Sequence, residues 1–122
     1  MLLIAYSVTT APGVTFWDAG EFIAAAHSFG IPHPPGTPLF VALGRGWTLL
    51  LGGTLGVARA MNLLSATCTA FAGGLSAWLV ARGVASERDA TWGAITGALC
   101  AGLMTSAWAN ATETEVYAFS LL

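Results

Sequence analysis

Two carboxylates, Asp18 and Glu21, stand three residues apart in the first part of the chain. On a helix this spacing places both side chains on one face, where they can reach a common ligand. Carboxylates beside apolar segments long enough to cross a membrane are costly to keep unless the protein uses them. A carboxylate near a hydroxyl can take its proton, which is general base catalysis. The candidate site is therefore the stretch from Val14 to Pro38.

The same acids also have a purely structural interpretation. Asp18 resembles a helix N-cap, and Glu21 would complete a capping box by reaching back to it. His33 could be a turn residue held by backbone hydrogen bonds, and the neighbouring prolines could be simple helix stoppers. Because a rigid turn from His33 to Gly36 follows a short alanine-rich helix, the pattern favours a site over a cap.

Further charged residues can join such a site. Arg45 and Arg59 each suit either an interfacial position or a contact with a phosphate. Glu113 and Glu115 are two residues apart, so on a helix only one of them can face a given site. Their alternative role is as solvated residues at a helix end. Nothing in the spacing of cysteines and histidines requires a metal, and no phosphate-loop or zinc-protease motif is present.

The composition indicates an integral membrane protein. Of the 122 residues, 56% are hydrophobic and 8% are charged, with a mean hydropathy of +0.73. Soluble domains carry about 25% charged residues. The net charge of −2 and the absence of lysine argue against nucleic acid as a partner. Cys68 and Cys100 lie in apolar runs, where thiols are more often buried side chains than disulfides or metal ligands.

The charges and prolines divide the chain into the elements that must position the acids. The fold class expected is an all-α fragment of a polytopic membrane protein, with about three transmembrane helices and short interfacial helices. The expected elements are a truncated first span (1–17), an extracytoplasmic loop (18–58), a second span (59–82), a cytoplasmic loop (83–91), a third span (92–112) and the start of the next extracytoplasmic segment (113–122). Within the loop at 18–58 we expect a helix over 18–29, ended by Gly30, and a second helix over 39–51, interrupted at 44–46. A flexible glycine joint (52–56) follows the second helix.

The sequence begins and ends within apolar runs, which predicts the N-terminal piece of a longer protein. The positive-inside rule places Arg82 and Arg88 in the cytoplasm, although Arg45 and Arg59 on the opposite side nearly cancel that bias. The loop with Asp18 and Glu21 and the segment with Glu113 and Glu115 then lie on the extracytoplasmic side, opposite the loop at 83–91.

The residues of this stretch resemble those of a known family. The chain is similar, over TFWDAGEFIAAAHSFGIPHPPGTPLFVALGR, MNLLSA and WANATETEVYA, to bacterial membrane proteins of a domain of unknown function. That family is related to the protein O-mannosyltransferases and has a eukaryotic transmembrane O-mannosyltransferase relative. The resemblance implies a GT-C architecture in the bacterial inner membrane, with an acidic motif in the first extracytoplasmic loop.

The resemblance also implies a set of roles. The donor would be a mannose-type sugar on a polyprenyl phosphate, and the acceptor a hydroxyl of a protein or glycan. Asp18 falls on the family's catalytic acid and would be the base, with Glu21 as the second catalytic acid. His33 and Glu115 match substrate-binding positions, and Arg45 would bind the donor's phosphate. An arginine or a divalent cation would supply the positive charge that this phosphate needs, and no other cofactor is expected.

Two other functions remain open from the residues alone. A transporter or proton relay would also carry acids in its membrane region, but it would place them near the middle of a span. A non-catalytic scaffold subunit would use small residues such as Gly93 and Gly97 for helix packing. It would tolerate replacement of Asp18 by Asn, whereas a transferase would not.

Overall fold

The computed structural model describes residues 1–33, 37–83 and 88–121, and over these residues its secondary structure is entirely helical. This confirms the all-α fold class. The helices are α1 (Leu2–Thr9), α2 (Ala19–Ser28), α3 (Pro38–Leu55), α4 (Val57–Gly83), α5 (Arg88–Gly102), α6 (Thr105–Thr112) and α7 (Val116–Ser120).

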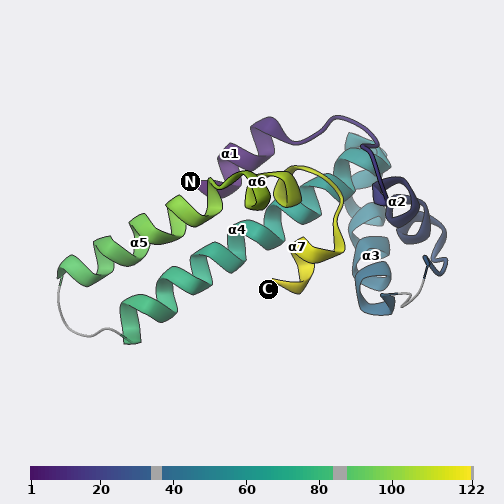
Figure 1. Ribbon diagram of the computed structural model, residues 1–122. Helices are drawn as coiled ribbons and strands as arrows, with labels where there is room; N and C mark the ends of the chain where they lie inside the picture. The colour runs from purple at the N-terminus through teal and green to yellow at the C-terminus, as the bar shows by residue number, and fades with distance from the viewer. Residues whose placement is uncertain (34–36, 84–87, 122) are drawn as a thin grey trace.

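The long helix α4 is the element against which the others pack (Figure 1). Helix α5 returns along its second half, and α1, α6 and α7 lie against it nearer its beginning. Helix α3 crosses the beginning of α4, and α2 packs on α3. The acidic start of α2 therefore lies at one end of α4, and the beginning of α5 lies at the other.

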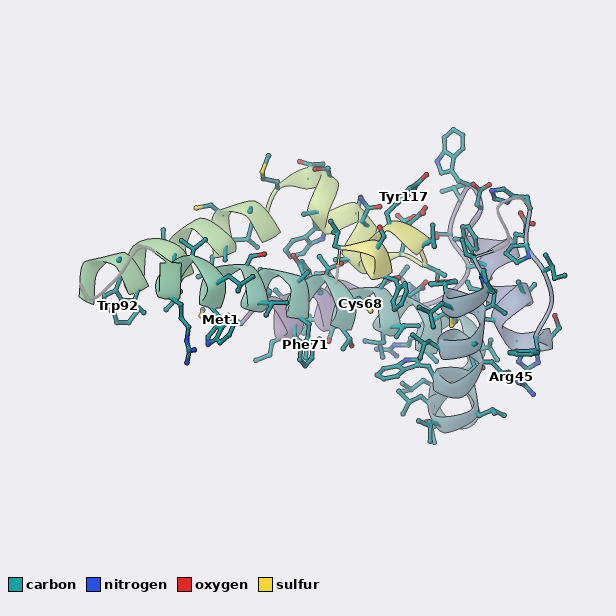
Figure 2. All side chains as sticks on the ribbon, turned by 90° about the horizontal axis from the view of Figure 1, so that it is seen from below. Met1, Arg45, Cys68, Phe71, Trp92 and Tyr117 are labelled. Atoms are coloured by element: carbon teal, nitrogen blue, oxygen red, sulfur yellow. The ribbon has the colours of Figure 1, made fainter. Side chains whose placement is uncertain are left out.

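Two of the described helices, α3 and α4, are long and apolar enough to cross a membrane. Helix α4 has 27 residues and a mean hydropathy of 1.5, whereas α3 has 18 residues and a mean hydropathy of 1.2. Both views show α3 running across α4 rather than alongside it (Figures 1 and 2). Only one of the two can therefore lie along the membrane normal. An interfacial position for α3 stays a prediction.

Two sequence-based expectations about α3 are wrong. The helix extends to Leu55 instead of ending at residue 51, and the glycines at 44, 46, 52 and 53 lie inside it. The joint to α4 is the single residue Gly56, whose φ of 81° suits glycine. Trp47 helps to fix this joint, because its Nε1 donates to the carbonyl of Ala60 at 2.8 Å.

The continuous helix expected over 92–112 is also wrong, because the structure has two helices there. Helix α5 ends at Gly102 and α6 begins at Thr105, with Met104 extended between them. The hydroxyl of Tyr6 on α1 donates to the carbonyl of Gly102 at 2.6 Å. This bond occupies a carbonyl that would otherwise accept a hydrogen bond from the next turn of a continuous helix.

The core consists of two groups of buried residues on α4. One lies where α2, α3 and α4 meet, and the other lies between α1, α4 and α6. The first group contains Phe22, Ile23, Ala25, Ala26, Phe40, Val41, Met61, Leu64 and Cys68, and the second contains Leu2, Tyr6, Ala66 and Ala111. Together they fix α2 and the end of α1, the two helices that flank the acidic stretch.

Gly44 allows α2, α3 and α4 to approach closely. A Cβ atom placed at Gly44 would lie 2.9 Å from the Cβ of Ala26 and 2.9 Å from the Cε of Met61. Gly46, two residues later, has no such neighbour within 4 Å. An added methyl group would therefore clash at Gly44 but not at Gly46, although both glycines lie in the same helix.

We expect Gly44→Ala to lower the free energy of unfolding by about 1–3 kcal/mol, because the core has no space for the methyl group. Gly46→Ala is the matched control and should be neutral or stabilising, since alanine is the better helix former. Thermal unfolding of both variants in detergent measures the difference. Equal midpoints for the two variants would contradict the close approach.

Candidate active site

Helix α2 begins at the acidic stretch, but the acids do not cap it. Asp18 occupies the N-cap position, and its side chain makes no capping hydrogen bond. Glu21 does not reach back to Asp18, because both of its carboxylate oxygens bond to His33. The capping-box interpretation of these acids is therefore wrong. At its other end α2 stops at Ser28, close to the expected boundary, with Phe29 rather than Gly30 in the left-handed conformation.

Glu21 and His33 form a two-point contact, which we call the Glu21–His33 clasp. The backbone N–H of His33 donates to Oε1 of Glu21 at 2.6 Å, and Nδ1 of the ring lies 2.8 Å from Oε2. Hydrogen bonding to His33 lowers the pKa of Glu21, and the same bond to Glu21 raises the pKa of His33. The ring of Phe22 lies against His33 with centroids 5.7 Å apart.

Asp18 lies beside this clasp. One ligand atom from each of Asp18, Glu21 and His33 lies within 4.8 Å of the others. The carboxylates and the imidazole suit a divalent cation such as Zn²⁺ or Mn²⁺. A cation bound at Nδ1 of His33 would have to replace the proton that the ring shares with Glu21. The residues present can therefore hold a metal ion only with the clasp opened or with the other ring nitrogen as ligand.

Glu115 approaches the same site from the other end of the sequence. It is the N-cap residue of α7, and its backbone N–H donates to Oγ of Ser65 on α4 at 3.2 Å. Burial raises the pKa of Glu115, and the negative charges of Asp18 and Glu113 raise it further. The structure thus brings together Asp18, Glu21 and His33, three of the five residues that the sequence predicts for the site. Glu115 lies close enough for the charge of Asp18 to act on its pKa.

Arg45, the fifth predicted residue, lies elsewhere. Its guanidinium Nη1 donates to the carbonyl of His27, in the last turn of α2. An arginine at this position suits the free carbonyls and the negative end of the helix dipole. Asp18 is at the opposite end of α2, so the structure gives Arg45 a contact within the fold. Its contact with a phosphate stays a prediction.

A residue that sequence reasoning missed, Asn62, holds the two acidic segments together. Its side chain is fully buried in α4. The Nδ2 group donates to the carbonyls of Ala11 and Gly13, at 2.9 Å each, and Oδ1 accepts a hydrogen bond from the hydroxyl of Thr114. Asn62 thus links the segment that leads to Asp18 with the segment that leads to Glu115. A buried amide within an apolar helix was the available signal, because such groups are costly unless they are bonded.

An apolar groove of about 770 Å³ lies away from these acids, between α1, α4 and α5. Met1, Phe71 and Trp78 are among the residues that line it. In Figure 2 Met1 and Phe71 lie along the α4–α5 pair, and Trp92 marks the end of this pair that is farthest from α2 and α3. The groove therefore belongs to the apolar body of the protein and not to the acidic site.

Comparison with known proteins identifies the family of the chain. Residues 18–122 match the family described as "Protein O-mannosyl-transferase TMEM260 N-terminal domain". The chain belongs to this family. The match begins at Asp18 and covers the clasp, Asn62 and Glu115. It confirms the predicted relation to protein O-mannosyltransferases, while the bacterial source and the GT-C architecture stay predictions.

Two relatives of the TMEM260 N-terminal domain family illustrate the similarity. The chain is 46% identical over 63 residues to "Protein O-mannosyl-transferase tmem260" of Dictyostelium discoideum, a region covering 51% of the chain and 8% of the relative. It is 38% identical over 77 residues to "Protein O-mannosyl-transferase TMEM260" of Mus musculus, covering 63% of the chain and 11% of the relative. The chain thus matches about a tenth of the length of these relatives. No solved structure matches it.

We expect Asn62→Ala to destabilise the protein strongly. The substitution leaves two partly buried carbonyls and the buried hydroxyl of Thr114 without this partner, at a cost of about 1–3 kcal/mol for each group that water does not reach. Asn110→Ala is the matched control, because the Asn110 amide bonds only to the carbonyl of Ser106 in its own helix. Thermal unfolding in detergent should show a large loss for Asn62→Ala and a small one for the control; similar losses would contradict the role of Asn62.

The Glu21–His33 clasp should depend on pH. The pKa of Glu21 is lowered from an ordinary 4.5 and that of His33 is raised from an ordinary 6.5. The ion pair is therefore complete between these values. It is lost as the pH falls through the lowered pKa of Glu21, and also as the pH rises through the raised pKa of His33.

Nuclear magnetic resonance of ¹⁵N-histidine-labelled protein in micelles measures the titration of His33, with a His27→Gln variant to assign the two ring signals. The titration midpoint of His33 is expected above 6.5. A midpoint at or below this value would show that the clasp does not form in solution.

Proposed function

We propose that the full-length protein containing this chain transfers a mannose-type sugar from a polyprenyl-phosphate donor to an acceptor hydroxyl, with Asp18 as the general base. The single observation that carries this proposal is that the Asp18 carboxylate is accessible and makes no side-chain hydrogen bond among the described residues. Asp18 is the first residue of the match to a family whose name refers to protein O-mannosyl transfer.

The chemistry of the proposed reaction fits the cluster of Asp18, Glu21 and His33, with Glu115 nearby. Asp18 takes the proton of the acceptor hydroxyl as its oxygen attacks the anomeric carbon of the sugar. The bond from that carbon to the phosphate oxygen breaks, and the polyprenyl phosphate leaves. Glu115, at the N-terminus of α7, can accept a hydrogen bond from a hydroxyl of the acceptor or of the sugar.

The departing phosphate needs positive charge close by. His33 is the group nearest to Asp18 that can carry such a charge, since the clasp with Glu21 raises its pKa. A divalent cation held by Asp18 and the clasp residues is the alternative source, and Arg45 is a third if its contact with α2 opens. When bound, a divalent cation would supply Lewis-acid stabilisation of the phosphate.

The proposed setting is a GT-C membrane domain in a bacterial inner membrane, with the acids on the extracytoplasmic side. Its support is the apolar α4, which can cross the bilayer, and the cluster of acids at one end of it. Asp18, Glu21 and Glu115 all lie at helix ends or in first turns, so none lies in the middle of α4. This arrangement suits an interfacial reaction better than a proton path through a span.

We expect Asp18→Asn to reduce sugar transfer by at least about 100-fold, the usual contribution of a general base. The assay uses the full-length protein in membranes, with radiolabelled polyprenyl-phosphate mannose, at matched expression. Asp89→Asn is the matched control, because Asp89 belongs to the first turn of α5, at the far end of α4.

The proposal is supported if wild type and Asp89→Asn transfer sugar and a folded Asp18→Asn variant does not. Equal transfer by all three proteins would remove Asp18 from the mechanism. Absence of transfer by the wild type from the mannose donor would contradict the proposed donor and favour the scaffold function.

A further inference from the structure

Glu21 has both carboxylate oxygens engaged by one residue. Oε1 accepts the backbone N–H of His33, and Oε2 bonds to the Nδ1 position of its ring. A carboxylate used in this way is a weak base, and hydrogen bonding moves its pKa in the wrong direction for taking a proton near neutral pH. Asp18, which no such bond engages, is free to act. The two acids of the motif are therefore not equivalent.

The clasp also holds the chain in an extended path. Helix α2 rises about 12 Å from Glu21 to Phe29. The chain then returns to Glu21 over the four steps from Phe29 to His33, which span at most about 13–14 Å when fully extended. The return segment, residues 30–33, has no helical structure. Such a segment stays in place only if its end is anchored.

The clasp supplies that anchor from the side of α2. Phe22, the next residue after Glu21, is buried and lies against both the ring of His33 and the ring of Phe40. Pro32 is buried on the same segment. The imidazole is thus held at one nitrogen and along one face. Its other nitrogen, Nε2, has no partner among the residues that the structure describes.

We propose that Glu21 is a positioning residue that takes no proton in the reaction: it holds His33 beside Asp18, so that Nε2 of the ring donates to a phosphate or sugar oxygen of the substrate. This inference rests on the proposed function for the substrate that His33 meets, but not for the clasp itself. His33 then touches the substrate, and Glu21 acts only through it.

The test compares Glu21→Gln with Glu21→Ala in the full-length protein. The oxygen of a glutamine can accept the backbone N–H of His33, and its amide N–H can donate to Nδ1 of a neutral ring. Glu21→Gln should therefore keep the position of the ring and retain transfer within about tenfold of wild type, whereas Glu21→Ala should lose about 100-fold. Glu113→Gln serves as the matched control for removal of a nearby negative charge.

A second readout does not depend on activity. Hydrogen exchange of the His33 backbone amide should be slow in wild type and Glu21→Gln, and faster in Glu21→Ala. The titration midpoint of the His33 ring should fall in both variants, because both lose the negative partner. Thermal unfolding verifies that each variant is folded.

The outcomes separate this inference from the proposed function. The positioning role would be overturned if Glu21→Gln were as inactive as Glu21→Ala while its His33 amide stayed protected from exchange. Glu21 would then be a reacting group. Unchanged exchange at His33 in Glu21→Ala would show that the clasp anchors nothing. If the wild type transfers no sugar but the exchange pattern is as expected, the proposed donor is rejected. The anchoring of His33 by the Glu21–His33 clasp would still be supported.

Discussion

The hydrogen bonds of the Asn62 amide are the constraint on which the site depends. Asn62 lies in α4, fully buried, and it bonds to one segment before α2 and to another after α6. These segments are about a hundred residues apart in sequence, and the backbone also joins them directly, through the N–H of Ala11 and the carbonyl of Thr112 at 3.0 Å. Because a buried amide is costly without partners, both segments must be in place for either to be stable.

The acidic site follows from this junction and from the packing of α2. The Asn62 bonds fix the approach of the chain to Asp18 and to Glu115, while the core around Gly44 fixes α2 against α3 and α4. The clasp then returns the chain from the end of α2 to its beginning. The side chains of Asp18, Glu21 and His33 thus meet near one end of an apolar helix, and Glu115 lies within reach of the charge of Asp18. The site is therefore built from loops and helix ends, as is usual where a rigid helical body supports chemistry.

The sequence predicts some of these features because they are local. The spacing of Asp18 and Glu21, the alanine-rich run and the glycine after it predict α2 closely, and the family resemblance predicts which polar residues gather. What the sequence did not predict depends on contacts between distant segments. Glycines suggested breaks in α3, but Gly44 lies inside the helix because a close approach requires it. At Gly102, where α5 ends, the carbonyl accepts a hydrogen bond from the hydroxyl of Tyr6, which lies 96 residues away in sequence.

The role of Glu21 shows the same limit. Its spacing from Asp18 fits a capping box, and only the position of His33 in space shows that the carboxylate turns the other way. Likewise, the charge of Arg45 suggested a phosphate, whereas the fold gives its guanidinium a carbonyl at the end of α2. Residue type and spacing indicate which groups are available, and the tertiary contacts decide which of them are already engaged.

The most direct measurement is an experimental structure of the full-length protein with a non-transferable polyprenyl-phosphate mannose analogue. Our account predicts the anomeric carbon of the sugar beside the Asp18 carboxylate, with Glu21 still bonded to His33 and the ring in contact with the phosphate or the sugar. A donor bound at the far end of α4, or a sugar next to a Glu21 that has released His33, would contradict it.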